Sequence, residues 1–188
     1  MPLCLWRAEA ICCRSARWAE GPQPQGPATV TGMAKLSAGI LVVRYLATEP
    51  QFLLVHPGGP FWARKDLGSW SIPKGEYGAG NDPLAEAVRE FEEELGVAMP
   101  DGERFALGSI TQAGGKIVTA WCVIGDIDLA AMASNTFELE WPPRSGTMRQ
   151  FPEVDRAEFF SQPEAERRIL ASQHPFLQRA LDAVNLAR

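Results

Sequence analysis

Three glutamates, Glu90, Glu93 and Glu94, stand close together in the stretch VREFEEELG. On a helix, residues three and four apart lie on the same side, so these carboxylates share one narrow sector. Like charges at this spacing disfavour a helix by about 0.2–0.5 kcal/mol per pair, although Arg89 can pair with Glu93. Hard oxygen ligands gathered in one place are what Mg²⁺ binds, whereas a solvated acidic face is the alternative interpretation. The residues alone leave both interpretations open.

The helix that carries these glutamates is the clearest element in the sequence and is predicted over Pro83–Leu95. Asp82 is a suitable N-cap, a proline occupies the first helical position, and Gly96 supplies the stop. The apolar residues of the helix form one stripe: Leu84, Val88, Phe91 and Leu95. The glutamate sector lies outside this stripe and must therefore face solvent or a cleft. Glu92 points elsewhere and is expected to be ordinary surface.

The rest of the chain predicts strands around this helix. Runs rich in β-branched and aliphatic residues predict strands at Leu36–Leu46, Gln51–Pro57, Arg104–Thr111, Lys116–Asp126 and Val154–Phe160, with a short extended piece at Asn135–Pro143. Helical spacing returns over Pro163–Gln173 and His174–Ala187, and loops are expected at Gly58–Trp70 and Trp141–Gln150. Several strands with one central helix and helices at the end indicate an α/β or α+β sandwich.

Composition narrows the possible functions. The chain has 188 residues, which favours one domain, and its net charge of −5 argues against a general nucleic-acid binder. No apolar run approaches the roughly 18 residues of a membrane span. The Pro/Gly/Gln-rich start of the chain predicts a disordered extension over residues 1–32, followed by one domain over residues 33–188.

Cysteine and histidine usage argues against a zinc site or a disulfide framework. The four cysteines are Cys4, Cys12, Cys13 and Cys122, and the two histidines are His56 and His174. No pair of cysteines has the spacing of a metal site. A reducing cytoplasm fits this usage best.

The stretch Gly75–Val97 resembles the Nudix box, G-x5-E-x7-R-E-U-x-E-E-x-G-U, in which U is a bulky apolar residue. Eight of the nine specified positions match, including Arg89-Glu90, Glu93-Glu94 and Gly96. The exception is Asn81, which stands where the pattern has its early glutamate. The resemblance implies a Nudix-type α/β/α sandwich with a mixed central sheet.

The resemblance also implies a metal site and its chemistry. Glu93 and Glu94 would be the principal Mg²⁺ ligands, with Mn²⁺ as a possible substitute, and Glu90 would be a metal ligand or the general base. Arg89 would orient the carboxylates, and the carbonyl of Lys74 would be a main-chain ligand. Water would be the nucleophile that cleaves a diphosphate. The early glutamate usually plays a supporting part, so Asn81 weakens the expectation of activity without removing it. Two neighbours could compensate for Asn81: Glu76 and Asp82, although the latter is expected to act as the helix cap.

The stretch WSIPKG, Trp70 to Gly75, is similar to the corresponding stretch of dinucleoside polyphosphate hydrolases, decapping-type enzymes and MutT-type nucleotide hydrolases. Lys74 would meet a phosphate as a point charge, while Trp70 is interpreted as a core anchor. Nudix enzymes often have one further carboxylate outside the box, and we expect Glu153 to be this metal ligand or base. Weaker candidates are Glu138 and Glu140, and a solvated charge is the alternative for all three.

Basic and aromatic residues outside the box are candidates for substrate binding. Those expected to contact phosphates are Arg64, Lys65, Lys116, Arg144 and Arg149, and those expected to stack on a base are Phe61, Trp62, Tyr77 and Trp141. An ordinary surface charge is the alternative for each of the basic residues.

These observations predict a Mg²⁺-dependent pyrophosphohydrolase in which water attacks a phosphorus of a nucleoside diphosphate linked to another group. Diadenosine polyphosphates or nucleoside triphosphates are the favoured substrates. The alternative is a catalytically weak Nudix-type module that senses a nucleotide, which Asn81 favours. We expect a small-molecule partner, no stable nucleic-acid partner, no membrane, a monomer or homodimer, and a cytoplasmic location.

Overall fold

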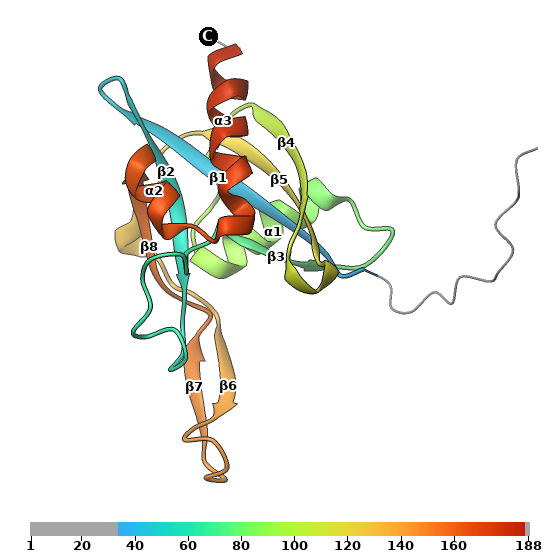
Figure 1. Ribbon diagram of the computed structural model, residues 1–188, viewed down its shortest axis with the longest axis vertical. Helices are drawn as coiled ribbons and strands as arrows, with labels where there is room; N and C mark the ends of the chain where they lie inside the picture. The colour runs from blue at the N-terminus through green and yellow to red at the C-terminus, as the bar shows by residue number, and fades with distance from the viewer. Residues whose placement is uncertain (1–33, 187–188) are drawn as a thin grey trace, which may run out of the picture. The chain divides into compact units, whose positions relative to one another are not determined.

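A mixed six-stranded sheet forms the centre of the computed structural model, which describes residues 34–186. Its strands are β1 (Leu36–Leu46), β2 (Glu49–Pro57), β3 (Lys74–Tyr77), β4 (Arg104–Thr111), β5 (Ile117–Ile124) and β8 (Val154–Ser161). Their order is β4-β5-β1-β2-β8, with β3 also paired to β1 (Figure 1). The β1–β5 pair is parallel and the other pairs are antiparallel, so the expected mixed sheet is confirmed. The extension expected over residues 1–32 lies outside the described residues.

Strand β1 divides one of its edges between two partners. Its C-terminal part, from Val43 onward, pairs with β2, whereas Leu36–Gly39 pairs with β3. The opposite edge of β1 pairs with β5 from Leu36 to Val43. Strands β2 and β3 therefore diverge along β1, and the Gly75 end of the box is fixed in the sheet at this divergence.

Helices cover both faces of the sheet, as the sandwich requires. Helix α1 (Pro83–Leu95) lies on one face, and helices α2 (Gln162–Arg168) and α3 (His174–Leu186) lie on the other. The period of two in β1 sends Ile40 to the α1 side and Leu41 to the α3 side. The alternation of apolar residues in β1 therefore supplies both cores.

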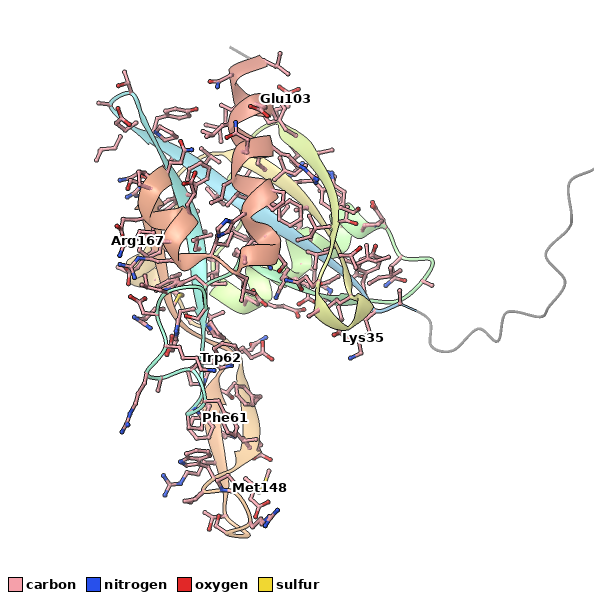
Figure 2. All side chains as sticks on the ribbon, viewed as in Figure 1. Lys35, Phe61, Trp62, Glu103, Met148 and Arg167 are labelled. Carbon is pink, nitrogen blue, oxygen red and sulfur yellow. The ribbon has the colours of Figure 1, made fainter. Side chains whose placement is uncertain are left out.

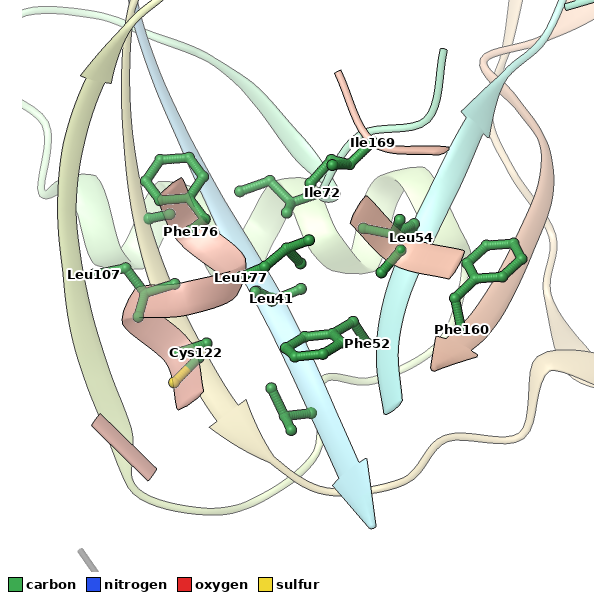
Figure 3. Packing of buried hydrophobic residues seen from close by; sticks show 14 of the residues in the cluster. Leu41, Phe52, Leu54, Ile72, Leu107, Cys122, Phe160, Ile169, Phe176 and Leu177 are labelled. Atoms are coloured by element: carbon green, nitrogen blue, oxygen red, sulfur yellow. The ribbon is translucent and has the colours of Figure 1, made fainter. Parts of the chain in front are cut away.

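The two cores have different helical partners. On the α1 side, Phe91 and Leu95 of the predicted apolar stripe are fully buried, and Leu84 and Val88 are half-buried against the same core, which confirms the stripe. Ala87, outside the predicted stripe, is also fully buried. On the other side, Phe176 and Leu177 of α3 pack over the sheet (Figure 3). The helix that carries the glutamates is thus packed against the sheet through its apolar stripe, and the glutamates lie outside this stripe.

A small second sheet stands apart from the main one. Strands β6 (Thr136–Glu140) and β7 (Met148–Pro152) form an antiparallel hairpin that projects away from the six-stranded sheet (Figure 1). The sequence predicted a loop over Trp141–Gln150, and this prediction was wrong for the part that forms β7. Three short 3-10 turns complete the described chain: Ala113–Gly115, Leu129–Ala131 and Ala171–Gln173.

Two further expectations can be compared with the described chain. Cys122 is a buried free cysteine in β5, and burial raises the pKa of its thiol to about 11. The other cysteines lie outside the described residues. No helix within residues 34–186 is long and apolar enough to cross a membrane.

Candidate functional site

The start of the box is held against β1 by close backbone contacts. The Ser37 hydroxyl donates to the Gly75 carbonyl at 2.6 Å, and the Ile40 amide donates to the Pro73 carbonyl at 3.1 Å. A Cβ at Gly39 would collide with the backbone of Pro73 and the side chain of Lys74. A glycine in this strand is therefore what lets the box approach the sheet so closely.

Helix α1 has the ends that its sequence predicts. The Asp82 carboxylate accepts from the Leu84 amide at 3.0 Å, so it is the N-cap. Gly96 has a φ of 68° and donates its amide to the Glu92 carbonyl at 2.8 Å. These caps fix where the helix begins and ends, and so fix the direction of its glutamates.

Arg89 is the centre of the acidic sector. Its guanidinium donates to Glu86 at 2.9 Å, to Glu93 at 2.6 Å, and to Glu90 in a still shorter contact. These bonds raise the pKa of the Arg89 guanidinium, with Glu93 as the largest contributor. The predicted Arg89–Glu93 pair is confirmed, and Arg89 holds two further carboxylates that its sequence position did not identify.

Glu94 turns away from Arg89 and toward the start of β3. One of its carboxylate oxygens accepts from the backbone amide of Lys74 at 3.0 Å. Burial raises the pKa of the Glu94 carboxyl to about 7, against the opposing influence of the Lys74 charge. Burial likewise lowers the pKa of the Lys74 ammonium, while the Glu94 charge acts in the opposite direction. This carboxylate and this ammonium therefore sit in a poorly solvated part of the site.

Glu153 is far from Glu94 in the sequence, but its charge acts on the Glu94 carboxyl in the folded structure. Its negative charge contributes to the raised pKa of the Glu94 carboxyl. The Gly58 amide donates to the Glu153 carbonyl at 2.9 Å, and the Glu153 amide donates to the Asn135 carbonyl at 2.8 Å. The exposed Glu153 is thus fixed by its backbone at the start of β8, beside the box.

Two features of the site bear on whether it can hold the divalent cation that the resemblance implies. They are the oxygen atoms that could coordinate the cation and the space around Gly75. Glu90, Glu93 and Glu94 offer hard carboxylate oxygens of the kind that Mg²⁺ prefers. A Cβ at Gly75 would overlap the Glu90 carboxylate, so the glycine provides the space in which this side chain lies. The residue types and this space fit a divalent cation.

The carboxylates have other partners in the described chain. Within residues 34–186, no three side chains of the metal-binding types are gathered closely enough to form a ready coordination group. Arg89 holds Glu90 and Glu93, and the Lys74 amide holds Glu94. A cation would therefore have to draw these side chains together in competition with Arg89.

The loop between β2 and β3 meets the β6–β7 hairpin through aromatic side chains. The rings of Phe61 and Trp141 are 5.3 Å apart in an edge-to-face arrangement, and Lys65 lies 4.3 Å from the centre of the Trp62 ring. Figure 2 shows Phe61, Trp62 and Met148 in this part of the molecule. The loop and hairpin thus form one surface that begins at Glu153 and leads away from the box.

The other substrate-binding candidates are distributed between this surface and the core. Arg64, Arg144 and Arg149 are exposed on the loop and the hairpin. Tyr77 is half-buried against the α1 core and pairs with Leu36, so the structure assigns it a packing contact. The remaining basic candidate, Lys116, pairs with Glu76 at 3.2 Å.

The buried side chain of His56 holds the loop between β2 and β3 in place through the Lys65 carbonyl. His56 is fully buried, with Nδ1 2.6 Å from a carboxylate oxygen of Asp155 and Nε2 2.8 Å from the Lys65 carbonyl. Since a carbonyl only accepts, the proton of this second bond lies on Nε2. Trp70 is almost fully buried against His56 and donates to Asp66 at 2.8 Å, which confirms that it is a core anchor.

Sequence reasoning assigned no role to several residues that shape the site. Ser37 is a polar residue in an apolar strand and Gly39 is a glycine in the same strand, and both are signals of a close backbone approach. Asp155 gave no signal, because its partner His56 lies 99 positions away in the sequence.

Comparison with known proteins agrees with this architecture. The family model described as the NUDIX domain matches residues 35–180. No curated protein sequence matches the chain. Among solved structures, the chain is similar to a C. elegans Ap4A hydrolase binary complex, with 19% identity, a TM-score of 0.55, and 81% of this chain and 99% of that chain covered.

Two further solved structures have the same fold. One is the NUDIX domain of Shewanella oneidensis NrtR complexed with ADP ribose, with 14% identity, a TM-score of 0.56, and 85% of this chain and 94% of that chain covered. The other is the C-terminal domain of mouse MUTYH in complex with human PCNA, with 15% identity, a TM-score of 0.52, and coverages of 81% and 91%. At these identities the likeness establishes the fold.

The family match covers most of the chain and includes the whole box, the divided β1 edge and β8. The chain therefore belongs to the NUDIX-domain family.

Proposed function

We propose that this NUDIX-domain protein is a Mg²⁺-dependent pyrophosphohydrolase that cleaves a nucleoside diphosphate linked to another group. Hydrolases of this family generally use divalent metals, and Mn²⁺ is the expected substitute. The observation that carries the proposal is the set of charges around Glu94, where Glu90, Lys74 and Glu153 all influence its carboxyl. These residues come from α1, β3 and the start of β8, so the fold gathers acidic and basic groups from three separate segments.

Each of these residues has a distinct task in the proposed reaction. Glu90, Glu93 and Glu94 would hold the cation, together with the Lys74 carbonyl, and Glu153 would be a further ligand or the base. When bound, Mg²⁺ neutralises phosphate oxygens and lowers the pKa of a bound water. Water forms the new bond to phosphorus, the anhydride P–O bond breaks, and a carboxylate of Glu153 or Glu90 accepts the water's proton.

The substrate proposal rests on the cationic and aromatic surface beside Glu153. Arg64, Arg144 and Arg149 can meet phosphates, and Trp62 or Trp141 can contact a base. A substrate with several phosphates between its reacting end and a nucleoside would use this surface. Two structures of the same fold carry the names of such molecules, Ap4A and ADP ribose, which supports a nucleotide with phosphoanhydride bonds. Diadenosine polyphosphates and nucleoside triphosphates are therefore the favoured substrates.

A substrate panel tests this proposal. The purified chain is incubated with Mg²⁺ and dinucleoside polyphosphates, nucleoside triphosphates, oxidised nucleotides, nucleotide sugars or capped RNA, and the products are identified. We expect cleavage of a phosphoanhydride, with dinucleoside polyphosphates or triphosphates processed fastest. Preferred cleavage of capped RNA or nucleotide sugars would contradict the substrate assignment. A cytoplasmic location, and a monomer or homodimer without a stable nucleic-acid partner, belong to the same proposal.

A nucleotide-sensing module with weak catalysis is the second candidate, and Asn81 at the early glutamate position is the observation that favours it. This second hypothesis predicts that a substrate from the panel binds to the protein but is not hydrolysed at saturating Mg²⁺ or Mn²⁺. Turnover that follows binding with either metal would exclude it.

A further inference from the structure

Asn81, the residue at which the box departs from its pattern, forms a side-chain hydrogen bond with Glu86 of helix α1. Its side-chain amide donates to Glu86 Oε1 at 2.7 Å. The other oxygen of the same carboxylate, Glu86 Oε2, accepts from Arg89 Nε at 2.9 Å and lies 2.8 Å from Arg89 Nη2. Glu86 therefore bridges the loop residue and the arginine of the box, one oxygen for each.

Arg89 continues this chain of contacts to the expected metal ligands. Its Nη1 donates to Glu93 at 2.6 Å, and its Nη2 also meets Glu90. Of the three carboxylates that hold Arg89, Glu86 is the one outside the expected metal-binding set. It is also more covered than Glu93, with 18% of its side chain exposed against 47%. Glu90 is covered to a similar degree, with 15% of its side chain exposed, so Glu86 is distinguished from it by lying outside the expected metal-binding set.

The two other acidic neighbours of Asn81 are engaged elsewhere. Asp82 accepts from the Leu84 amide as the helix cap. Glu76 forms ion pairs with Lys35 at 3.4 Å and with Lys116 at 3.2 Å. Neither of these carboxylates has a recorded contact with Arg89, and Asp82 is the helix cap that the sequence predicts.

We propose that Glu86, held by the Asn81 amide, is the positioning residue for Arg89 and supplies the carboxylate that the box lacks at position 81. The pair Asn81–Glu86 would then replace a single glutamate. Asn81 is suited to this task because its amide donates, whereas a glutamate at that position would place a second negative charge beside Glu86.

This inference rests on the proposed function where it concerns the metal. A cation that recruits Glu90 and Glu93 competes with Arg89 for the same oxygens. Glu86 offers Arg89 a partner that the cation does not need, so it allows the arginine to release the other two carboxylates. Without the Glu86 charge, Arg89 would hold Glu90 and Glu93 more firmly and metal affinity would fall.

The first test measures Mg²⁺ binding alone, by calorimetry and without substrate. Glu86→Gln keeps the size of the side chain and removes its charge, and we expect Mg²⁺ affinity to fall about fivefold. Glu92→Gln is the matched control, because it removes the same charge from the same helix at a residue bonded to the Met99 amide instead of Arg89. An equal loss of affinity in the two variants would overturn the proposal.

The second test asks whether Glu86 acts through Arg89. In an Arg89→Ala background, Glu86→Gln should weaken Mg²⁺ binding no more than Glu92→Gln does. An undiminished effect of Glu86→Gln in this background would contradict the proposal. The same cycle of Glu86→Gln and Arg89→Ala is measured on the unfolding free energy of the metal-free protein, where the two changes should be non-additive. This metal-free readout remains valid if the wild-type chain binds no Mg²⁺, a result that would count against the proposed function alone.

The third test restores the glutamate of the pattern. Asn81→Glu alone should weaken Mg²⁺ binding, because the new carboxylate faces Glu86. Asn81→Glu combined with Glu86→Gln should recover most of the wild-type affinity, so that each change is harmful alone and the pair is tolerated. If the double variant instead loses as much Mg²⁺ binding free energy as the sum of the two single variants, the proposal that positions 81 and 86 can exchange roles would be overturned.

Discussion

The box region and the loop–hairpin surface are held in place by different kinds of contact. In the box, formed by β3 and α1, the Gly75 carbonyl is bonded to Ser37, the Lys74 amide to Glu94, and Arg89 to three carboxylates. On the loop–hairpin surface, formed by residues 58–69 and the β6–β7 hairpin, an aromatic pair joins the loop to the hairpin and the arginines are exposed. In the box, hydrogen bonds hold the charged side chains in fixed positions. On the loop–hairpin surface, the charged side chains are exposed.

This difference corresponds to two different requirements of the proposed reaction. Chemistry at phosphorus depends on reacting groups held within a fraction of an ångström, which a rigid sheet and a capped helix provide. Recognition of a polyphosphate and its base tolerates variation, and loops on a rigid scaffold commonly supply it. Changes in the box should therefore lower the rate, whereas changes on the loop–hairpin surface should weaken substrate binding.

Among single substitutions, the largest effect is expected from Gly75→Ala. A Cβ at this position overlaps the Glu90 carboxylate, so the glutamate must leave its place. We expect the turnover rate to fall about 100-fold, as for other displaced catalytic groups. Steady-state kinetics on the preferred substrate measures this loss.

Gly78→Ala is the matched control for this change. Gly78 lies three residues further along, and a Cβ there meets no atom within 4 Å. Its turnover rate should stay close to that of the wild-type chain. Equal losses in the two variants would show that the loss at Gly75 does not come from the displacement of Glu90, and this would contradict the prediction.

A smaller effect is expected on stability when Glu94 becomes Gln in the metal-free protein. The pKa of the Glu94 carboxyl rises from 4.5 to about 7 on folding, so the folded state binds a proton that the unfolded state has lost between these values. The wild-type chain therefore loses stability as the pH rises through this window, and the loss is complete above about pH 7.

Glu94→Gln removes this pH dependence and keeps an acceptor for the Lys74 amide. Its stability relative to the wild-type chain should rise by about 1–3 kcal/mol between about pH 5 and pH 8. Urea unfolding in the presence of a chelator measures the difference. A difference that does not change over this range would contradict the buried position assigned to Glu94.

The smallest effect is expected on the loop–hairpin surface. Arg144→Ala with Arg149→Ala removes two exposed cations, and we expect KM for a polyphosphate substrate to rise about fivefold with little change in kcat. Arg104→Ala, on the far strand β4, is the control and should leave both constants unchanged. A fall in kcat at constant KM would instead place these arginines in the chemical step.

Local sequence signals predicted the central elements well. The structure reproduces the predicted bounds of Leu36–Leu46, Arg104–Thr111 and Pro83–Leu95, because each has a strong periodicity or clear caps. The acidic sector of α1 followed from helical geometry alone. These features depend on residues near one another in the chain, which a single sequence displays directly.

Features that depend on distant partners were not predictable in the same way. Strand β3 is short and glycine-containing, and it exists because β1 offers it an edge. Strand β7 exists because β6 pairs with it across the Trp141–Thr147 connection. The role proposed for Glu86 could be inferred only from the folded structure. The loop before the helix determines which way the Asn81 amide points, and so determines that it meets Glu86. Contacts of this kind depend on the folded backbone and leave no local pattern.

The central claim is that the carboxylates of α1 hold the divalent cation on which hydrolysis depends. The most direct measurement is the rate of hydrolysis of the preferred substrate as Mg²⁺ is varied, for the wild-type chain and for Glu93→Gln combined with Glu94→Gln. The wild-type rate should rise to a plateau with Mg²⁺ and disappear with a chelator, and the double variant, shown by circular dichroism to be folded, should lose at least about a thousandfold in rate. Activity that survives in the double variant with the same dependence on Mg²⁺ would contradict the assignment of the metal site.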